Sequence, residues 1–233
     1  MTQVNRHDGY QDLFVRSHFE PTLVVQDNCL HIPSNSRLVS LNELAIQPMS
    51  RGAVFLDRDG VLIKDVHYLR NPSQLRILPR VVEALQSLQK YFYLIVITNQ
   101  SGVGRGFFTE ADLLEIHGKL IQGLAAEGAL VDGLYYCPHH PEAIVPAYRV
   151  ICQCRKPKPD LLLRAKHEWN IDMTSSFMIG DKVSDIQAGV AANTKGILLS
   201  NEELSLPSGC ILAANLGDAA HQILTEMERE RLI

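Results

Sequence analysis

The stretch AVFLDRDGV, residues 53–61, places four apolar residues directly before two aspartates and a glycine. We expect residues 53–56 to form a buried strand, because a short apolar run bounded by turn residues is typical of one. Asp57 and Asp59 follow on extended backbone, where residues two apart point to the same side. Gly60 permits a sharp exit from the strand. Two carboxylates this close repel each other unless a cation or a shared proton relieves the repulsion.

The alternation of short apolar runs with helical patterns continues from this stretch to the end of the chain. A second strand is expected at 93–98, after a helix at 79–90 whose apolar residues recur on one face. A longer helix is expected at 109–128, with Thr109 as N-cap and Asp112 at the capping-box position. The remaining expected elements are strands at 134–136, 176–180, 196–200 and 210–213 and helices at 159–169, 184–192 and 218–233, the last with Asp218 as a cap.

This order of elements predicts the fold class. Repeated strand–helix alternation is typical of a Rossmann-like α/β fold, in which a parallel sheet carries helices on both faces. Sheets of this kind bind ligands at the carboxyl ends of their strands. The residues that directly follow 53–56, 93–98 and 176–180 are therefore the candidates for chemistry.

The composition excludes several classes of protein. Hydrophobic residues make up 46% of the 233 residues, charged residues make up 21%, and the net charge is −4, as in a water-soluble globular protein. The negative charge gives no general attraction to nucleic acid. The longest apolar run, 91–97, is far too short to span a membrane, and residues 1–20 lack the apolar core of a signal peptide. We therefore expect a cytoplasmic protein that binds neither nucleic acid nor membrane.

Residues 1–50 differ in character from the rest, so we divide the chain into an extension at 1–50 and one domain at 51–233. Within the extension, residues 22–32 are predicted to form a hairpin that turns at Asp27 and Asn28, since these residue types tolerate the required backbone. Residues 35–52 resemble a linker with one short helix. The simplest interpretation of the extension is structural. We expect a monomer, although the extension could mediate association.

Residues of complementary chemistry follow four of the expected strands. Thr98 ends the second strand, and the glycine-containing turn after it can bring backbone N–H groups to an anion. Arg155 and Lys156 follow the third strand and its loop, where they could clamp a phosphate. Asp181 follows the strand at 176–180, with Asp185 one helical turn beyond, and such oxygen ligands suit Mg²⁺. Each feature alone is ambiguous, but together they suggest metal-assisted phosphoryl transfer to a nucleophilic aspartate.

A compact block holds three of the five cysteines. Cys137-x-His139, twelve residues, and then Cys152-x-Cys154 supply four ligands that suit a closed, structural Zn²⁺ site. Thiols stay reduced in the cytoplasm, so metal binding is favoured over a disulfide. A catalytic zinc would need an open position, which four good ligands do not leave. A reduced, metal-free cluster remains the alternative. The histidines in helical segments are interpreted as packing or surface residues, namely His117, His167 and His221.

The motifs DRDG, TNQSG, RKP and GDKVSD resemble the four motifs of the haloacid-dehalogenase-like phosphatases. With YYCPHHPE and CQCRKPKP added, the pattern is similar to the D-glycero-D-manno-heptose-1,7-bisphosphate 7-phosphatases and their histidinol-phosphatase relatives. The resemblance runs from about residue 51 to the last helix. It implies a haloacid-dehalogenase-like fold with little or no cap domain, and Mg²⁺ and structural Zn²⁺ as cofactors. Residues 1–50 match nothing in the family, and residues 201–207 replace an expected arginine–threonine–glycine-like turn.

The resemblance also implies residue roles. Asp57 would be the nucleophile, and Asp59 would protonate the leaving oxygen and later activate water. Mg²⁺ would be held by Asp57, the backbone carbonyl of Asp59 and Asp181. Thr98 and Lys156 would steady the phosphoryl group, and Arg155 would recognise the substrate. Zinc would take His139 rather than His140. The implied substrate contacts are Arg58, Asp65, His67, Tyr68, Asn99, Gln100, Ser101, Arg155 and Lys182.

Three functions follow from these observations. The resemblance implies hydrolysis of a phosphorylated sugar through an aspartyl-phosphate, with a heptose 1,7-bisphosphate as the expected substrate and heptose 1-phosphate as the product. The first alternative keeps the chemistry but acts on histidinol phosphate or another small phosphate ester. The second alternative is a zinc-stabilised binding module without catalysis.

Overall fold

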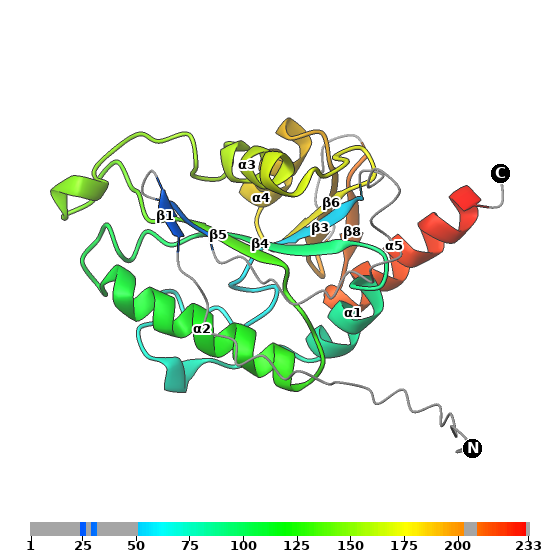
Figure 1. Cartoon of the computed structure of the whole chain (residues 1–233), viewed down its shortest axis with the longest axis horizontal. Helices are drawn as coiled ribbons and strands as arrows, with labels where there is room; N and C mark the ends of the chain where they lie inside the picture. Colours follow the sequence, from blue (N-terminus) through cyan, green and yellow to red (C-terminus); the bar gives the residue numbers. More distant parts are fainter. Residues whose placement is uncertain (1–23, 27–28, 32–50, 203–208, 232–233) are drawn as a thin grey trace, which may run out of the picture.

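The computed structural model describes residues 24–26, 29–31, 51–202 and 209–231, which form a layered α/β fold (Figure 1). These residues contribute eight strands to one sheet, in the order β1-β2-β5-β4-β3-β6-β7-β8. The strands are β1 (Val24–Gln26), β2 (Cys29–His31), β3 (Ala53–Leu56), β4 (Tyr93–Asn99), β5 (Gly133–Cys137), β6 (Phe177–Gly180), β7 (Lys195–Leu199) and β8 (Ile211–Ala213). The helices are α1 (Val81–Leu88), α2 (Glu110–Ala126), α3 (Asp160–Trp169), α4 (Val183–Ala191) and α5 (Leu216–Arg231), with short 3-10 turns η2 (Pro72–Gln74) and η3 (Pro146–Tyr148).

Six adjacent strands, from β5 across to β8, run parallel. Figure 1 shows α1, α2 and α5 on one face of the sheet and α3 and α4 on the other. Alternation along each strand creates two cores. In β3, Val54 and Leu56 pack with α1, α2 and α5, whereas Ala53 and Phe55 pack with α3 and α4. The Rossmann-like fold predicted from the sequence is therefore confirmed.

A hairpin extends the sheet beyond its parallel part. β1 pairs antiparallel with β2, and β2 pairs antiparallel with β5, where His31 lies opposite Tyr135. The strands of the predicted hairpin are thus present, while its turn residues 27–28 lie outside the described residues. Residues 35–50 of the predicted linker, which was expected to contain one short helix, also lie outside them. The division of the chain at residue 50 stays a prediction.

The starts of two helices show how local sequence fixes an element. The predicted capping box of α2 is present, because the Asp112 N–H donates to Thr109 Oγ1 at 3.1 Å and the Thr109 N–H donates to Asp112 Oδ2 at 2.8 Å. The prediction that Asp218 caps α5 was wrong. The helix begins two residues earlier, and Asn215 Oδ1 accepts from the Asp218 N–H at 3.1 Å. The Asp218 carboxylate instead binds Arg80 at 2.6 Å.

The parallel register brings the carboxyl ends of β3, β4, β5 and β6 to one edge of the sheet. Leu56 lies opposite Val96 on β4 and Ile179 on β6, and Asn99 lies opposite Cys137 on β5. The loop between β3 and α1 contains η2 as its one named element. This loop holds no folded cap domain, as the family resemblance implies. We therefore look for the site among the residues at the carboxyl ends of these strands.

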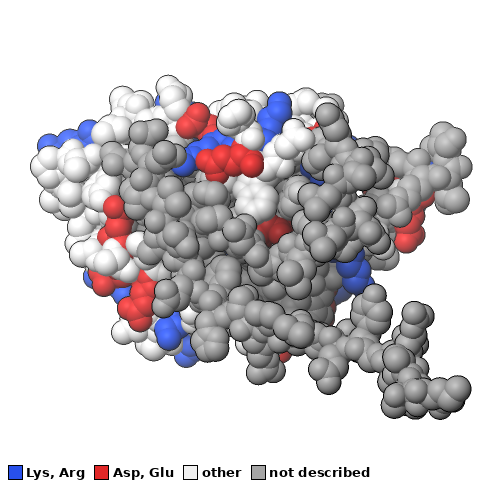
Figure 2. Space-filling model, viewed as in Figure 1, with Lys and Arg blue, Asp and Glu red and all other residues white. Residues whose placement is uncertain are grey.

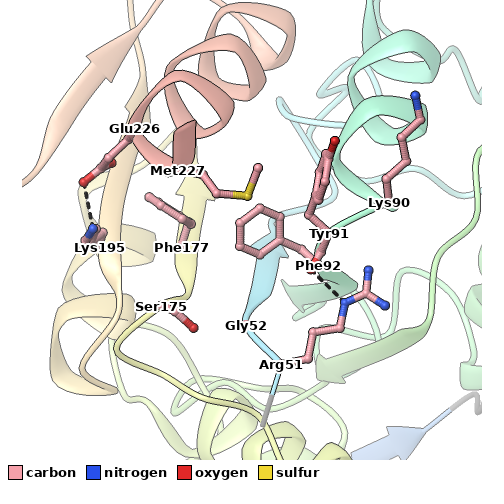
Figure 3. A pocket seen from close by; sticks show the side chains of 10 residues that line it. All are labelled: Arg51, Gly52, Lys90, Tyr91, Phe92, Ser175, Phe177, Lys195, Glu226 and Met227. Atoms are coloured by element: carbon pink, nitrogen blue, oxygen red, sulfur yellow. Dashed lines mark hydrogen bonds and ion pairs between the residues drawn. The ribbon is translucent and has the colours of Figure 1, made fainter. Parts of the chain in front are cut away.

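The opposite edge of the sheet carries a hollow of about 390 Å³ (Figure 3). Arg51 and Tyr91 line it just before β3 and β4, and Lys195 lines it at the start of β7. Arg51 Nε donates to the Tyr91 carbonyl at 2.8 Å, and Lys195 pairs with Glu226 at 2.7 Å. Met227 reaches into the hollow from α5. None of the residues predicted to form the site lines this hollow.

Charges are mixed on the described part of the face shown in Figure 2, where acidic and basic side chains are interspersed. This distribution agrees with the small net charge of −4. Among the described residues, no helix has both the length and the apolar character that crossing a membrane requires.

Candidate active site and metal centre

A buried lysine forms the centre of the carboxylate site. Lys156 Nζ lies 2.9 Å from Asp57 Oδ1 and 2.7 Å from Asp185 Oδ1, and it donates to the Ile97 carbonyl at 2.7 Å. Burial lowers the pKa of Lys156, but the two carboxylates outweigh this effect and hold its pKa above the ordinary value. The ammonium group therefore stays charged, directly beside the residue predicted to be the nucleophile.

Three carboxylates meet at the ends of β3 and β6. Asp57, Asp181 and Asp185 each offer an oxygen within 4.8 Å of the others. Asp181 Oδ1 is buried and has no hydrogen-bond partner among the described residues. Burial, together with the charges of Asp57 and Asp185, raises the pKa of Asp181 to about 6 even though Lys182 opposes the shift. Clustered carboxylates with an unpartnered oxygen fit Mg²⁺, which prefers a few carboxylates, water and substrate phosphate.

Two glycines allow these carboxylates to approach. Gly60 has a φ of +80°, and a side chain there would collide with the Asp181 carboxylate. A side chain at Gly180 would likewise collide with Asp185. The sharp exit predicted at Gly60 is thus present, and its main consequence is the space that it leaves for Asp181.

The Mg²⁺ ligands that the family resemblance implies do not include Asp185, although the sequence places it one helical turn beyond Asp181. The structure places its Oδ1 on Lys156, while its Oδ2 accepts from the Lys182 N–H at 3.0 Å. It therefore fixes the lysine and the start of α4 together. The sequence signal for Asp185 is its position: it lies in the first turn of a helix that begins just after Asp181, the acid at the end of a strand.

The second aspartate of the DRDG motif is held by an arginine. Arg58 Nη2 donates to Asp59 Oδ1 at 2.9 Å and to Oδ2 at 2.8 Å, and Gln100 Nε2 donates to Asp59 Oδ2 at 2.9 Å. The Asp59 side chain keeps 16% of its surface exposed, whereas that of Arg58 keeps 1%. Arg58, which the resemblance makes a substrate contact, points into the fold and contacts Asp59, Gln100 and His117.

The turn after β4 is tied to both parts of this site. Gln100 Nε2 also donates to Thr98 Oγ1 at 2.9 Å. The Asn99 amide brackets the backbone of Lys156, since its Oδ1 accepts from the N–H and its Nδ2 donates to the carbonyl, each at 3.1 Å. Ser101 accepts through its carbonyl from the Arg105 N–H at 2.9 Å and begins the following turn. The side chains of Asn99 and Gln100, predicted to contact substrate, therefore bind neighbouring protein groups.

The other predicted substrate contacts lie along the segment after β3 and beside α4. Lys182 Nζ lies 3.3 Å from Asp65 Oδ2 and 3.7 Å from Asp181 Oδ2. Burial raises the pKa of Asp65, but the His67 N–H and Lys182 reverse this and hold its pKa below the ordinary value. Tyr68 packs edge-on against Phe107, with 4.6 Å between ring centroids. The structure thus places Asp65 beside Lys182, and Tyr68 lies on the same segment as Asp65.

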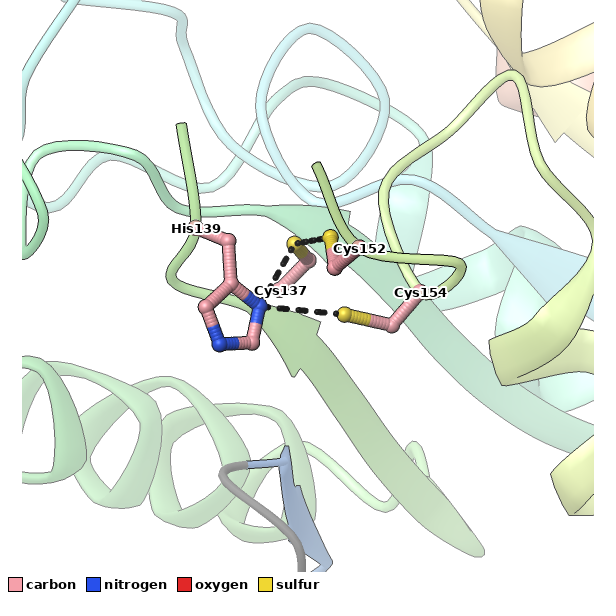
Figure 4. Close-up of side chains that lie close together, drawn as sticks. All are labelled: Cys137, His139, Cys152 and Cys154. Atoms are coloured by element: carbon pink, nitrogen blue, oxygen red, sulfur yellow. Dashed lines mark hydrogen bonds between the residues drawn. The ribbon is translucent and has the colours of Figure 1, made fainter. Parts of the chain in front are cut away.

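The Cys/His cluster lies where β5 ends (Figure 4), and its four ligand atoms point toward a common centre. Cys137 Sγ lies 3.5 Å from Cys152 Sγ and 3.6 Å from His139 Nδ1, and His139 Nδ1 lies 3.2 Å from Cys154 Sγ. A disulfide would require sulfurs about 2.05 Å apart. Tetrahedral zinc, with bonds of about 2.3 Å to sulfur and about 2.0 Å to nitrogen, separates its ligand atoms by about 3.5–3.8 Å. The cluster therefore fits Zn²⁺ in a closed site.

The Cys/His cluster is continuous with the carboxylate site. Cys154 directly precedes Arg155, and Arg155 Nη1 donates to the His139 carbonyl at 3.3 Å. The Gln100 N–H donates to the Cys137 carbonyl at 2.7 Å, which joins the turn after β4 to the first zinc ligand. The loop between the ligand pairs is thus connected at both ends to residues that surround Lys156.

A glutamate that the sequence reasoning missed ties the same loop to α2. Glu110 accepts from the Tyr136 hydroxyl at 2.8 Å through Oε1 and from the Tyr148 hydroxyl at 2.8 Å through Oε2. Burial and the hydrogen bond to Glu110 raise the pKa of Tyr148 to about 12. An acid in the first turn of a helix is common, so the sequence gives no sign that Glu110 accepts hydrogen bonds from two tyrosines.

Comparison with known proteins identifies the family. The chain is 39% identical over 180 residues to a D-glycero-beta-D-manno-heptose-1,7-bisphosphate 7-phosphatase of Rhodopseudomonas palustris, covering 77% of this chain and 93% of that protein. The chain belongs to the heptose-1,7-bisphosphate 7-phosphatase family. The protein of the same name from Escherichia coli strain K12 is 45% identical over 142 residues, 60% of this chain and 74% of the relative. A family model described as HAD-hydrolase-like matches residues 153–205.

Solved structures agree with this family assignment. The D,D-heptose 1,7-bisphosphate phosphatase from B. bronchiseptica, complexed with magnesium and phosphate, matches with a TM-score of 0.68 and 31% identity over 75% of this chain and 99% of its own. A putative haloacid-dehalogenase-like phosphatase from Mesorhizobium loti matches with a TM-score of 0.75 and 28% identity over 87% of this chain and 96% of its own. The predicted family and enzyme class, a haloacid-dehalogenase-like phosphatase, are confirmed.

Proposed function

We propose that this chain is a Mg²⁺-dependent phosphatase that removes the 7-phosphate of D-glycero-D-manno-heptose 1,7-bisphosphate and leaves heptose 1-phosphate. The observation that carries the chemistry is the buried ion pair of Asp57 with Lys156, next to the unpartnered oxygen of Asp181. The substrate follows from the names of the relatives, including the magnesium and phosphate complex.

In the first half of the reaction, the Asp57 carboxylate attacks phosphorus and the bond from phosphorus to the sugar oxygen breaks. The Asp59 carboxyl group gives its proton to that departing oxygen. Lys156 offsets charge on the phosphoryl oxygens, and we assign the Thr98 hydroxyl to the same task. Mg²⁺, held by Asp57, the Asp59 carbonyl and Asp181, would neutralise further charge there.

In the second half, Asp59 takes a proton from water, and the water oxygen attacks the phosphorus of the aspartyl-phosphate. The bond from phosphorus to Asp57 breaks, so phosphate leaves and the carboxylate is restored. The separate environments of the two aspartates support this division of labour. Asp57 is buried and forms an ion pair with the Lys156 ammonium group. Asp59 is partly exposed and forms an ion pair with buried Arg58.

The charged residues around the carboxylates suit a substrate with a second phosphate. Arg155 follows the zinc ligands, and Lys182 keeps 54% of its side chain exposed near Asp65. We assign these two cations, with His67, Tyr68 and Ser101, to recognition of the sugar and its remaining phosphate. The monomeric state and the cytoplasmic location expected from the sequence stay predictions.

Asp57→Asn tests the proposed chemistry. The variant should lose release of phosphate from heptose 1,7-bisphosphate to background while keeping the thermal midpoint Tm of the parent. Asp160→Asn, which removes an exposed carboxylate on α3, is the matched control and should keep full activity. Wild-type kcat/KM values on heptose bisphosphate and histidinol phosphate decide the substrate. A preference for histidinol phosphate would overturn the assignment to heptose.

A further inference from the structure

A fully buried histidine contacts the arginine of the DRDG motif. His117 lies on α2 with 0% of its surface exposed, and its Nε2 lies 3.0 Å from Arg58 Nη1. A guanidinium group can only donate hydrogen bonds, so Nε2 must be the acceptor and the imidazole proton must sit on Nδ1. Nδ1 has no hydrogen-bond partner among the described residues. The ring thus leaves one buried donor unsatisfied and uses its other nitrogen on Arg58.

The contact requires a neutral imidazole. An imidazolium ion would set donor against donor and cation beside cation. Burial and the positive charge of Arg58 both hold the pKa of His117 well below its ordinary value. His117 therefore remains an acceptor for Arg58 throughout the neutral range.

The arginine is held at its other donors as well. Nη2 binds both oxygens of Asp59 and the Gln100 Oε1, the last at 3.0 Å, and Nε lies 3.2 Å from Asp59 Oδ1. These contacts lie on the side of the guanidinium that faces Asp59. His117 supplies the contact at Nη1, so it stops the planar group from turning about its bond to the side chain.

We infer that His117 is a positioning residue for the acid–base step, because it fixes the guanidinium that aims the Asp59 carboxylate at the leaving oxygen. This inference rests on the proposed function. His117 is separate from the three-carboxylate cluster and from the Cys/His cluster. The alternative is a packing role, for which the 5.6 Å separation of the His117 and Tyr136 rings would suffice.

The two roles differ in their dependence on the leaving group. A sugar alkoxide needs a proton as it departs, whereas p-nitrophenolate leaves without one, so general-acid catalysis matters for the first and little for the second. The value of kcat/KM covers the steps up to departure of the leaving group. A displaced Asp59 should therefore lower kcat/KM for the sugar bisphosphate far more than for p-nitrophenyl phosphate. A general loosening of the fold should lower both alike.

The experiment compares His117→Leu, His117→Gln and the wild type as full chains with Mg²⁺. The leucine removes the acceptor, whereas the glutamine amide oxygen can take the place of Nε2. We expect His117→Leu to lose about tenfold to hundredfold in kcat/KM on heptose bisphosphate, as misplacement of a general acid does, and about threefold or less on p-nitrophenyl phosphate. His117→Gln should recover most of the loss. Ile116→Val, a buried change on the same helix, should lower neither value selectively.

Equal losses on both esters, or no loss on either, would overturn the role given to His117. Failure of His117→Gln to recover activity selectively on the sugar ester would do the same. If His117→Leu does not fold, His117→Asn replaces it, because its shorter amide stops near Nδ1 and does not reach Arg58. A wild-type protein that releases phosphate from neither ester would contradict the proposed function itself, a result distinct from parallel losses in the variants.

Discussion

Two clusters of metal-ligating side chains lie along the same edge of the sheet, and they differ in hardness and in completeness. The carboxylate cluster of Asp57, Asp181 and Asp185 carries a lysine and one oxygen without a partner among the described residues. The Cys/His cluster presents four borderline or soft ligands, and three of their separations, 3.2, 3.5 and 3.6 Å, are close to those around tetrahedral zinc. The incomplete set suits a metal that must also meet substrate, and the complete set suits a metal that holds a loop.

The two clusters are joined by a short stretch of backbone. Cys154 belongs to the Cys/His cluster, and Lys156, two residues later, forms ion pairs within the carboxylate cluster. A zinc ion that fixes Cys154 would also fix where the Lys156 side chain begins. The cysteines can therefore matter for phosphoryl transfer without contacting the phosphate.

The largest expected effect comes from the lysine in the carboxylate cluster. Lys156→Met removes the charge that balances Asp57 and Asp185, so kcat/KM for phosphate release should fall by about a thousandfold or more. Breaking a buried ion pair on one side should also destabilise the Mg²⁺-free fold by about 3–5 kcal/mol. Lys166→Met, an exposed change on α3, is the control and should alter neither quantity. Activity within tenfold of the parent would remove Lys156 from the mechanism.

The next effect comes from the Cys/His cluster. Cys152→Ser with Cys154→Ser should abolish the single zinc that we expect per chain, as measured by elemental analysis of protein purified without chelator. Loss of the metal should lower the thermal midpoint Tm, by roughly 2–4 °C for each 1 kcal/mol of stability lost in a domain of this size. Cys210→Ser lies outside the cluster and should retain the zinc. A wild-type protein that holds no zinc would show that the Cys/His cluster is not a structural metal site.

A smaller effect is the pH dependence of stability that arises from the carboxylate cluster. The pKa of Asp181 is raised to about 6 from an ordinary value of 3.8, so the metal-free fold favours the protonated acid. The folded state then binds more protons than the unfolded chain between these values, and this group destabilises the metal-free fold as pH rises through about 6. Mg²⁺ binds the carboxylate, so the rise in Tm on adding Mg²⁺ should be larger near pH 8 than near pH 5. The effect should reach about 1–2 kcal/mol and should disappear in Asp181→Asn.

The smallest predicted effect tests whether zinc alone holds the loop. Glu110→Gln weakens the hydrogen bonds from Tyr136 and Tyr148, so stability should fall by about 1 kcal/mol, or about 2–4 °C in Tm. Glu115→Gln, on the same helix and exposed, is the control and should leave Tm unchanged. An unchanged Tm for Glu110→Gln would assign the order of this loop to the metal cluster alone.

The sequence predicted the strands, their alternation with helices along the chain and the residues of both clusters, because apolar periodicity and strand-end residues report directly on a layered fold. It did not predict the order of the strands within the sheet. It also did not predict which residues the long, buried polar side chains contact. Alternation places Arg58 on the opposite side from Asp57 and Asp59, yet the arginine side chain is long enough to return to Asp59. Helical periodicity likewise placed His117 on α2 without naming its partner. Such contacts depend on packing between elements, which single-strand and single-helix patterns do not contain.

In the proposed reaction, Asp57 carries the phosphoryl group between the two halves. Asp59→Asn should form this intermediate from p-nitrophenyl phosphate, whose leaving group needs no acid, but should hydrolyse it slowly because no base activates water. Rapid acid quench followed by peptide mass spectrometry should then find one phosphoryl group on Asp57, with a matching burst of p-nitrophenol. A burst with the phosphoryl group on another residue, or continued turnover with Asp57 unmodified, would show that Asp57 is not the nucleophile.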